Sequence, residues 1–204
     1  MRTVDPVKHA FQRQAVLAAA RACFMRDGFH RTSTEAIRIE AGTSSGKLFH
    51  YFPTKKAIIL AVVEDQSRQT ASWMESLRRQ PQFPAALTAF LDGILHLASD
   101  AGERRLILEI AAEGARDADV AAASMAGDRL LEEGLAALLR DATARGQAHP
   151  LIPADHAVRF LMVLVDGIFS RVAVDGNFDP MAERAALATV IRAIFGIDAT
   201  DRDA

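Results

Sequence analysis

The sequence predicts an all-α protein of about nine helices. Hydrophobic residues recur at spacings of three and four along the 204-residue chain, which is the period of a helix with one buried face. No segment alternates apolar and polar residues as a half-buried strand does. Glycine, proline and N-capping residues divide the chain at intervals suited to helices.

Local signals place the first two helices. The first is expected to begin after Asp5, with proline in its first turn, and to stop at Gly28. Thr32 and Glu35 have the spacing of a capping box, so a short second helix is expected from there to Gly42.

The remaining boundaries follow in the same way. Ser44 or Ser45 caps a third short helix that ends before Pro53, and Thr54 caps a long fourth helix over about 55–77. Further helices are expected over about 84–99, 103–115, 118–145, 154–174 and, after an Asp-Pro start, 180–196. Residues 198–204 form a polar tail.

Composition excludes several classes of protein. Cys23 is the one cysteine, so no internal disulfide is possible, and it sits at an apolar position of the first helix. No apolar run is long enough to span a membrane and no secretory signal is visible, which favours a cytoplasmic protein. Phosphate-binding and nucleophile motifs are absent, so we expect no enzyme activity, no cofactor and no metal site.

Charge is unevenly distributed. Residues 1–56 carry ten basic and four acidic side chains, including all four lysines, whereas the whole chain has a net charge of −2. A basic head on an acidic body indicates a polyanionic partner for the head. Chance clustering on a solvated surface is the alternative.

The basic head contains a candidate helix-turn-helix over residues 28–56. Two short helices flank Gly42, which tolerates the positive φ that a tight turn needs. The second helix begins with small polar and basic residues, so its free N–H groups can approach a phosphate. These are Ser44, Ser45, Gly46 and Lys47. Such a helix can enter the major groove of DNA.

This segment resembles the DNA-binding domain of the TetR family of bacterial regulators over about residues 8–60. The matching positions are Gly28-Phe29, Thr32-Ser33-Thr34, Ile37, Ala41-Gly42, Ser44, Gly46, Phe49, Phe52 and Lys55. Four positions depart from the family pattern: Arg38 replaces a small alanine, Thr43 a valine, Phe49 a tyrosine and Tyr51 a histidine. Arg38 must either reach past the packed helix or point at DNA.

The resemblance implies which residues contact DNA. Lys47 and Ser45 are expected at base edges. Thr34, Phe49, His50, Tyr51 and Lys55 are expected on the phosphate backbone. Lys47 and His50 as ordinary surface residues, and Phe49 as a core aromatic, remain alternatives.

The body is expected to form a dimer. The 154–174 segment is apolar almost all round, so it needs cover on two sides, and a second copy of the chain can supply one of them. A central helix within one monomer is the alternative. The expected interface comprises Phe160, Leu164, Gly167, Ile168, Leu187, Ile191 and Ile194.

The family resemblance also implies a small effector bound within the body, and the low polarity suggests an apolar or aromatic molecule. Its candidate lining residues, each of which plain core packing also explains, are Trp73, Phe90, His96, Met125, Phe160 and Phe169. We therefore expect a DNA-binding domain at 1–54 and an effector-binding and dimerisation domain at 55–197. The hypothesis is an effector-responsive homodimeric repressor on a palindromic operator; the alternatives are a DNA-binding dimer without an effector, and a small helical enzyme or carrier.

Overall fold

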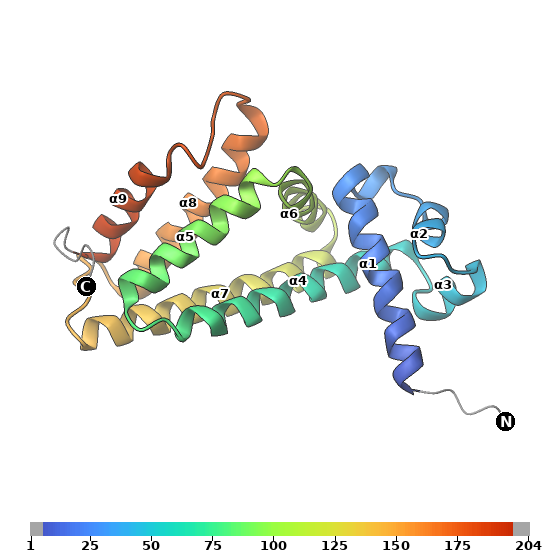
Figure 1. Cartoon of the computed structure of the whole chain (residues 1–204), viewed down its shortest axis with the longest axis horizontal. Coiled ribbons are helices and arrows are strands. Elements are labelled where there is room, and N and C mark those ends of the chain that lie inside the picture. The colour runs from blue at the N-terminus through green and yellow to red at the C-terminus, as the bar shows by residue number, and fades with distance from the viewer. Residues whose placement is uncertain (1–5, 198–204) are drawn as a thin grey trace. The chain divides into compact units, whose positions relative to one another are not determined.

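The computed structural model describes residues 6–197, and these fold into helices without strands (Figure 1). The helices are α1 (Pro6–Arg31), α2 (Thr34–Glu40), α3 (Ser45–Tyr51), α4 (Lys55–Arg78), α5 (Phe83–Ser99), α6 (Ala101–Gly114), α7 (Ala118–Ala144), α8 (Ala154–Val174) and α9 (Arg184–Phe195). No helix in the described part of the chain is both long and apolar enough to cross a membrane. The all-α prediction is confirmed.

The chain forms two compact units. The first comprises Met1–Gln66 and Ala101–Ser124, and the second comprises Ser67–Asp100 and Met125–Ala204. The long helices α4 and α7 each contribute one part to each unit. The first unit contains more of the chain than the predicted domain that ends at residue 54, because α6 and the start of α7 pack with the N-terminal helices. The predicted tail at 198–204 lies outside the described residues.

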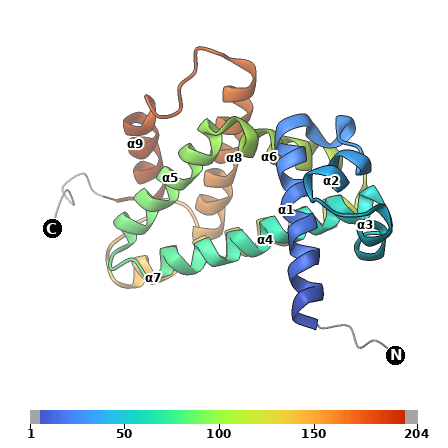
Figure 2. The ribbon, with the colours of Figure 1, turned by 45° about the vertical axis from the view of Figure 1, so that its right-hand side comes forward.

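A continuous apolar core organises the first unit. In it, α1 contacts α2 and α6, and α2 contacts α3, as Figures 1 and 2 both show for the three N-terminal helices. Phe24 and Phe29 meet edge to face with ring centroids 4.8 Å apart. Ile37 of α2 and Leu48 of α3 are fully buried in the same cluster. One inward residue on each short helix thus fixes which face points away from the core.

The second unit has its own core. Helix α5 packs on α8 and α9, and α8 packs on α9. Phe83 and Phe195 meet edge to face at 5.8 Å. Arg184 at the start of α9 donates two hydrogen bonds to Asp92 of α5, at 2.6 and 2.9 Å.

The predicted starts of α2 and α9 were wrong, and the predicted end of α1 at Gly28 is a kink rather than the end of the helix. Ser33, rather than Thr32, is the N-cap of α2; its hydroxyl accepts from the amide of Ala36 at 3.0 Å. Thr32 is buried instead, and its hydroxyl donates to the carbonyl of Gly28 at 2.7 Å. At Gly28, the predicted stop, φ is +78°, but a further helical turn follows this kink.

The other wrong boundary is the start of the last helix. It begins at Arg184, four residues later than predicted, because Asp179 and Pro180 open a turn. The carboxylate of Asp179 accepts from the amide of Met181 at 2.9 Å, which closes a local turn.

Candidate functional site

The connection between α2 and α3 is the turn of a helix-turn-helix. Gly42 adopts φ +57°, which an L-residue rarely adopts, and its amide donates to the carbonyl of Ile39 at 3.0 Å. Ser44 then caps α3, with its hydroxyl accepting from the amide of Lys47 at 3.3 Å. The expectation of Ser44 as one of two possible caps is confirmed.

Helix α3 presents a polar outer face. Leu48 is 1% exposed and anchors the helix in the core. The residues that point away from the core are Ser45, Gly46, Lys47, Phe49 and His50. The side chain of Phe49 is 46% exposed, so the alternative of a core aromatic does not hold. Since a reading helix must expose small and basic groups at its N-terminal end, this face has the composition that major-groove contact needs.

The C-terminal end of α3 lies against α1. The hydroxyl of Tyr51 donates to the amide oxygen of Gln12 at 3.0 Å, and its ring meets that of His9 at 4.8 Å. His50 stands edge-on to both His9 and Tyr51. The Tyr51 hydroxyl is therefore engaged within the protein, whereas the exposed His50 ring borders the outer face.

The two lysines at the start of α4 have different surroundings. Lys55 donates to the carbonyl of His30 at 3.4 Å, which leaves its charge without an acid partner in that contact. Lys56 forms ion pairs at 2.7 Å with Asp117 and Asp119, and these hydrogen bonds raise the pKa of the Lys56 ammonium. Only Lys55 of the two is therefore suited to a phosphate. Thr34, in the first turn of α2, is half-buried beside its cap.

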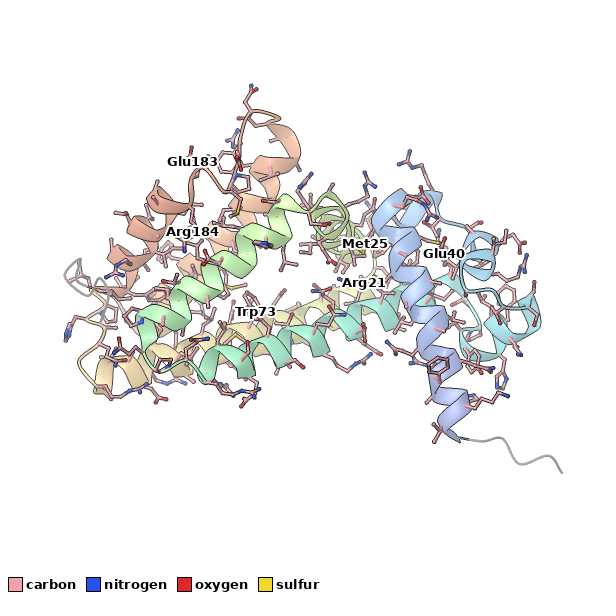
Figure 3. The ribbon with its side chains drawn as sticks, in the orientation of Figure 1. Arg21, Met25, Glu40, Trp73, Glu183 and Arg184 are labelled. Atoms are coloured by element: carbon pink, nitrogen blue, oxygen red, sulfur yellow. The ribbon has the colours of Figure 1, made fainter. Side chains whose placement is uncertain are left out.

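Helix α6 holds the C-terminal end of α1. The carboxylate of Glu109 accepts from the amide of Phe29 at 3.0 Å, directly after the Gly28 kink. Arg105 donates to the carbonyls of Met25 and Arg26, and Arg21 pairs with Glu103 (Figure 3 labels Arg21 and Met25 on α1). These contacts were missed because nothing in a single sequence pairs residues 80 positions apart.

The candidate effector residues differ widely in burial, and two of them are in contact. Trp73 of α4 stacks on Phe90 of α5, with centroids 5.2 Å apart and rings inclined by 13° (Figure 3 labels Trp73). Phe90 and Phe169 are buried, at 1% and 4% exposed. Met125 and Phe160 are more than half exposed, and His96 is also exposed. Trp73 and Phe90 thus form a stacked pair within the predicted set.

Helices α8 and α9 share an open apolar groove of about 670 Å³. Six of the seven predicted dimer residues line it: Phe160, Leu164, Gly167, Ile168, Leu187 and Ile194. Ile191 is 2% exposed and belongs to the core of its own unit. The groove is also lined by Leu151, Ile152, Val163, Phe178, Val190 and Ala193, of which Leu151, Ile152 and Phe178 lie in loops where no helical period marks them.

Comparison with known proteins assigns both parts of the chain. Residues 16–62 match the family model for bacterial regulatory proteins of the tetR family, and residues 83–196 match the model for the C-terminal part of BetI-type transcriptional repressors. The HTH-type transcriptional regulator UidR of Escherichia coli (strain K12) is 32% identical over 186 residues, which cover 90% of this chain and 91% of UidR.

Solved structures of other transcriptional regulators have the same fold. Salmonella enterica GusR superposes with a TM-score of 0.76 at 25% identity, covering 96% of this chain and 99% of GusR. The complex of SmeT with triclosan has the same fold, with a TM-score of 0.77 at 22% identity over 94% of this chain and 95% of SmeT. The chain belongs to the TetR family of transcriptional regulators, which are not enzymes.

Proposed function

We propose that this protein is a homodimeric repressor that binds a palindromic operator in the bacterial cytoplasm and is released by a small apolar or aromatic effector. Residues 1–54 supply DNA binding and residues 55–197 supply effector binding and dimerisation. The observation that carries the DNA-binding part is the outer face of α3, where Ser45, Lys47 and His50 are exposed while Leu48 is buried. The match to BetI-type repressors supports repression.

The outer face of α8 supports the dimer. Phe160 and Val163 are 59% and 63% exposed, and a β-carbon added at Gly167 would meet no atom within 4 Å. The alternative of a central helix buried within one monomer does not fit these exposures. An apolar surface of this kind favours contact with a second copy of the same chain, because a two-fold dimer buries the same patch on both partners.

The triclosan bound to SmeT supports an aromatic effector, since the two proteins share a fold. Among the candidate lining residues, the stacked Trp73 and Phe90 are the aromatic pair that such a ligand would contact, through the less buried Trp73. A ligand that changes the ratio of the operator-binding form to the released form from 99:1 to 1:99 must bind the released form more tightly by about 5.5 kcal/mol.

Selection of bound fragments from the source genome tests the proposal. We expect the full-length protein to enrich a palindrome whose half-sites are about one helical turn, roughly 34–36 Å, apart or a little more. The genes beside that site identify candidate effectors, and release of the site by one of them distinguishes this function from a DNA-binding dimer without an effector. Failure to enrich any site, or enrichment without two-fold symmetry, contradicts the proposal.

A further inference from the structure

Arg38, which departs from the family pattern, bridges the turn that leads into α3. Its guanidinium donates two hydrogen bonds to the carboxylate of Glu35, at 2.6 and 2.8 Å. A third donor, Nη1, reaches the carbonyl of Thr43 at 3.0 Å. In return, the amide of Thr43 donates to the carbonyl of Arg38 at 3.2 Å. One side chain on α2 therefore holds the residue that precedes the cap of α3.

The geometry needs arginine. A planar guanidinium can grip a carboxylate with two parallel bonds and still direct a further donor elsewhere, whereas an ammonium on a flexible stem is a point charge. The hydrogen bond from Arg38 lowers the pKa of the Glu35 carboxyl, which is already ionised near neutral pH, so the pair also persists under mildly acidic conditions. Of the two alternatives predicted for Arg38, reaching past the packed helix or pointing at DNA, neither included these bonds to Glu35 and to the carbonyl of Thr43.

The bond to Thr43 acts on the position of α3. Thr43 immediately precedes Ser44, whose hydroxyl caps the helix that carries Lys47. A displacement of about 1 Å there changes which base edge Lys47 reaches, because base readout relies on directional hydrogen bonds.

We propose that Arg38 is a positioning residue that fixes the start of α3 and so determines how sharply the protein discriminates its operator from related sequences. Glu35 orients the Arg38 guanidinium. This inference rests on the proposed operator-binding function. Arg38 differs from a phosphate contact in that its Nε and both terminal nitrogens already donate to protein acceptors.

Substitution of Arg38 in the full-length protein tests this role. Affinity is measured for the selected site and for the same site with one base pair replaced in each half. We expect Arg38→Ala to lower the ratio of the two affinities by about tenfold, because a misplaced α3 loses part of the cost of each mismatch. Arg38→Lys should not rescue the ratio. Arg31→Ala, which removes the same charge from a side chain bonded to the carbonyl of Asp27, is the control and should preserve it.

The salt dependence separates positioning from phosphate contact. A lost phosphate contact lowers the slope of log affinity against log salt by about 0.9 per protomer and weakens all sequences alike. We expect Arg38→Ala to leave that slope unchanged. An unchanged affinity ratio, with or without a reduced slope, overturns the inference.

A measurement without DNA keeps the inference testable if the proposed function fails. We expect Arg38→Ala to speed amide hydrogen exchange at Thr43 and Lys47 in the free protein, with no change at the buried core of α1. Equal exchange in both proteins overturns the positioning role even if an operator is found. If the wild-type protein enriches no site, the operator function fails, while the exchange result still decides the role of Arg38.

Discussion

Lys47 and Lys55 carry the same charge but occupy different places on the head of the molecule. Lys47 is exposed in the first turn of α3, where a side chain can reach a base edge. Lys55 begins α4 and contacts the carbonyl of His30. A lysine at a base edge contributes to discrimination, whereas a lysine at a phosphate contributes to affinity alone.

Alanine substitution of the two lysines should therefore have different effects on DNA binding. We expect Lys47→Ala to cost about 1–3 kcal/mol at one base pair of each half-site and to relax the preference there. Lys55→Ala should weaken binding to all sequences evenly and flatten the salt dependence. Affinities measured across a panel of single-base variants and salt concentrations distinguish the two. If Lys47→Ala weakened binding to every DNA sequence equally, Lys47 would not be a base contact.

Cys23 provides a second test at the scale of a residue. Its side chain is fully buried beside Phe24, and burial raises the pKa of its thiol. We expect the native protein to resist alkylation at pH 7 and to react only after unfolding, because the reactive thiolate is both inaccessible and unfavourable. Rapid labelling of the native protein, monitored by mass spectrometry, would contradict this burial.

At the scale of helices, the kink at Gly28 depends on an acid from α6. The amide of Phe29 finds its acceptor in the carboxylate of Glu109. A β-carbon at Gly28 would lie 2.5 Å from a carboxylate oxygen of Glu109, and φ there is +78°. The positive φ therefore favours glycine, and a larger residue there would also displace the carboxylate that accepts from Phe29.

Removal of that acceptor should destabilise the first unit. We expect Glu109→Ala to lower the free energy of unfolding by about 1–3 kcal/mol, because a partly buried amide loses its hydrogen-bond partner. Glu109→Gln retains an acceptor oxygen and should recover part of the loss. Denaturant unfolding of the three proteins measures the difference, and an unchanged midpoint for Glu109→Ala would show that water replaces the carboxylate without cost.

Sequence signals located most helices because caps and breakers act locally. Ser44 and Thr54 cap the helices that follow them, as predicted, and each binds an amide three residues ahead. The start of α9 was misplaced because an Asp-Pro pair suits a turn as well as a helix. The bond from Arg38 to Thr43 was not predictable, since it depends on a side-chain rotamer and on the path of the turn.

For the whole molecule, the proposed binding to a palindromic operator requires two copies of the chain. Gly167 faces the open groove on α8, and a helical glycine costs stability relative to most residues. A bulky side chain there should leave the fold of each chain intact while obstructing a partner. Dimerisation and folding can therefore be separated experimentally.

We expect Gly167→Arg to be monomeric, to keep its helical content, to unfold at a midpoint that does not depend on protein concentration, and to bind a full operator far more weakly. Ala185→Arg adds the same charge on exposed α9 surface outside the groove and should remain dimeric. Light scattering coupled to size-exclusion chromatography measures the mass of each. A dimeric Gly167→Arg protein with normal operator affinity would place the interface elsewhere.

The effector region can be monitored by fluorescence, because Trp73 is the only tryptophan of the chain. Its stack on Phe90 makes its emission sensitive to any ligand that enters between or beside the rings. We expect an effector that releases the operator to change Trp73 emission with the same concentration dependence. Operator release without any change in emission would place the effector away from this pair.

Hydroxyl-radical footprinting of the selected operator tests whether two copies of α3 bind it with two-fold symmetry. Two copies of α3 reading successive major grooves predict two equivalent protected regions, roughly 34–36 Å apart and related by two-fold symmetry. The protein with Lys47→Ala should keep both protections while it loses sequence preference. One protected region, or protection spread without symmetry, would contradict a dimeric reader that uses α3.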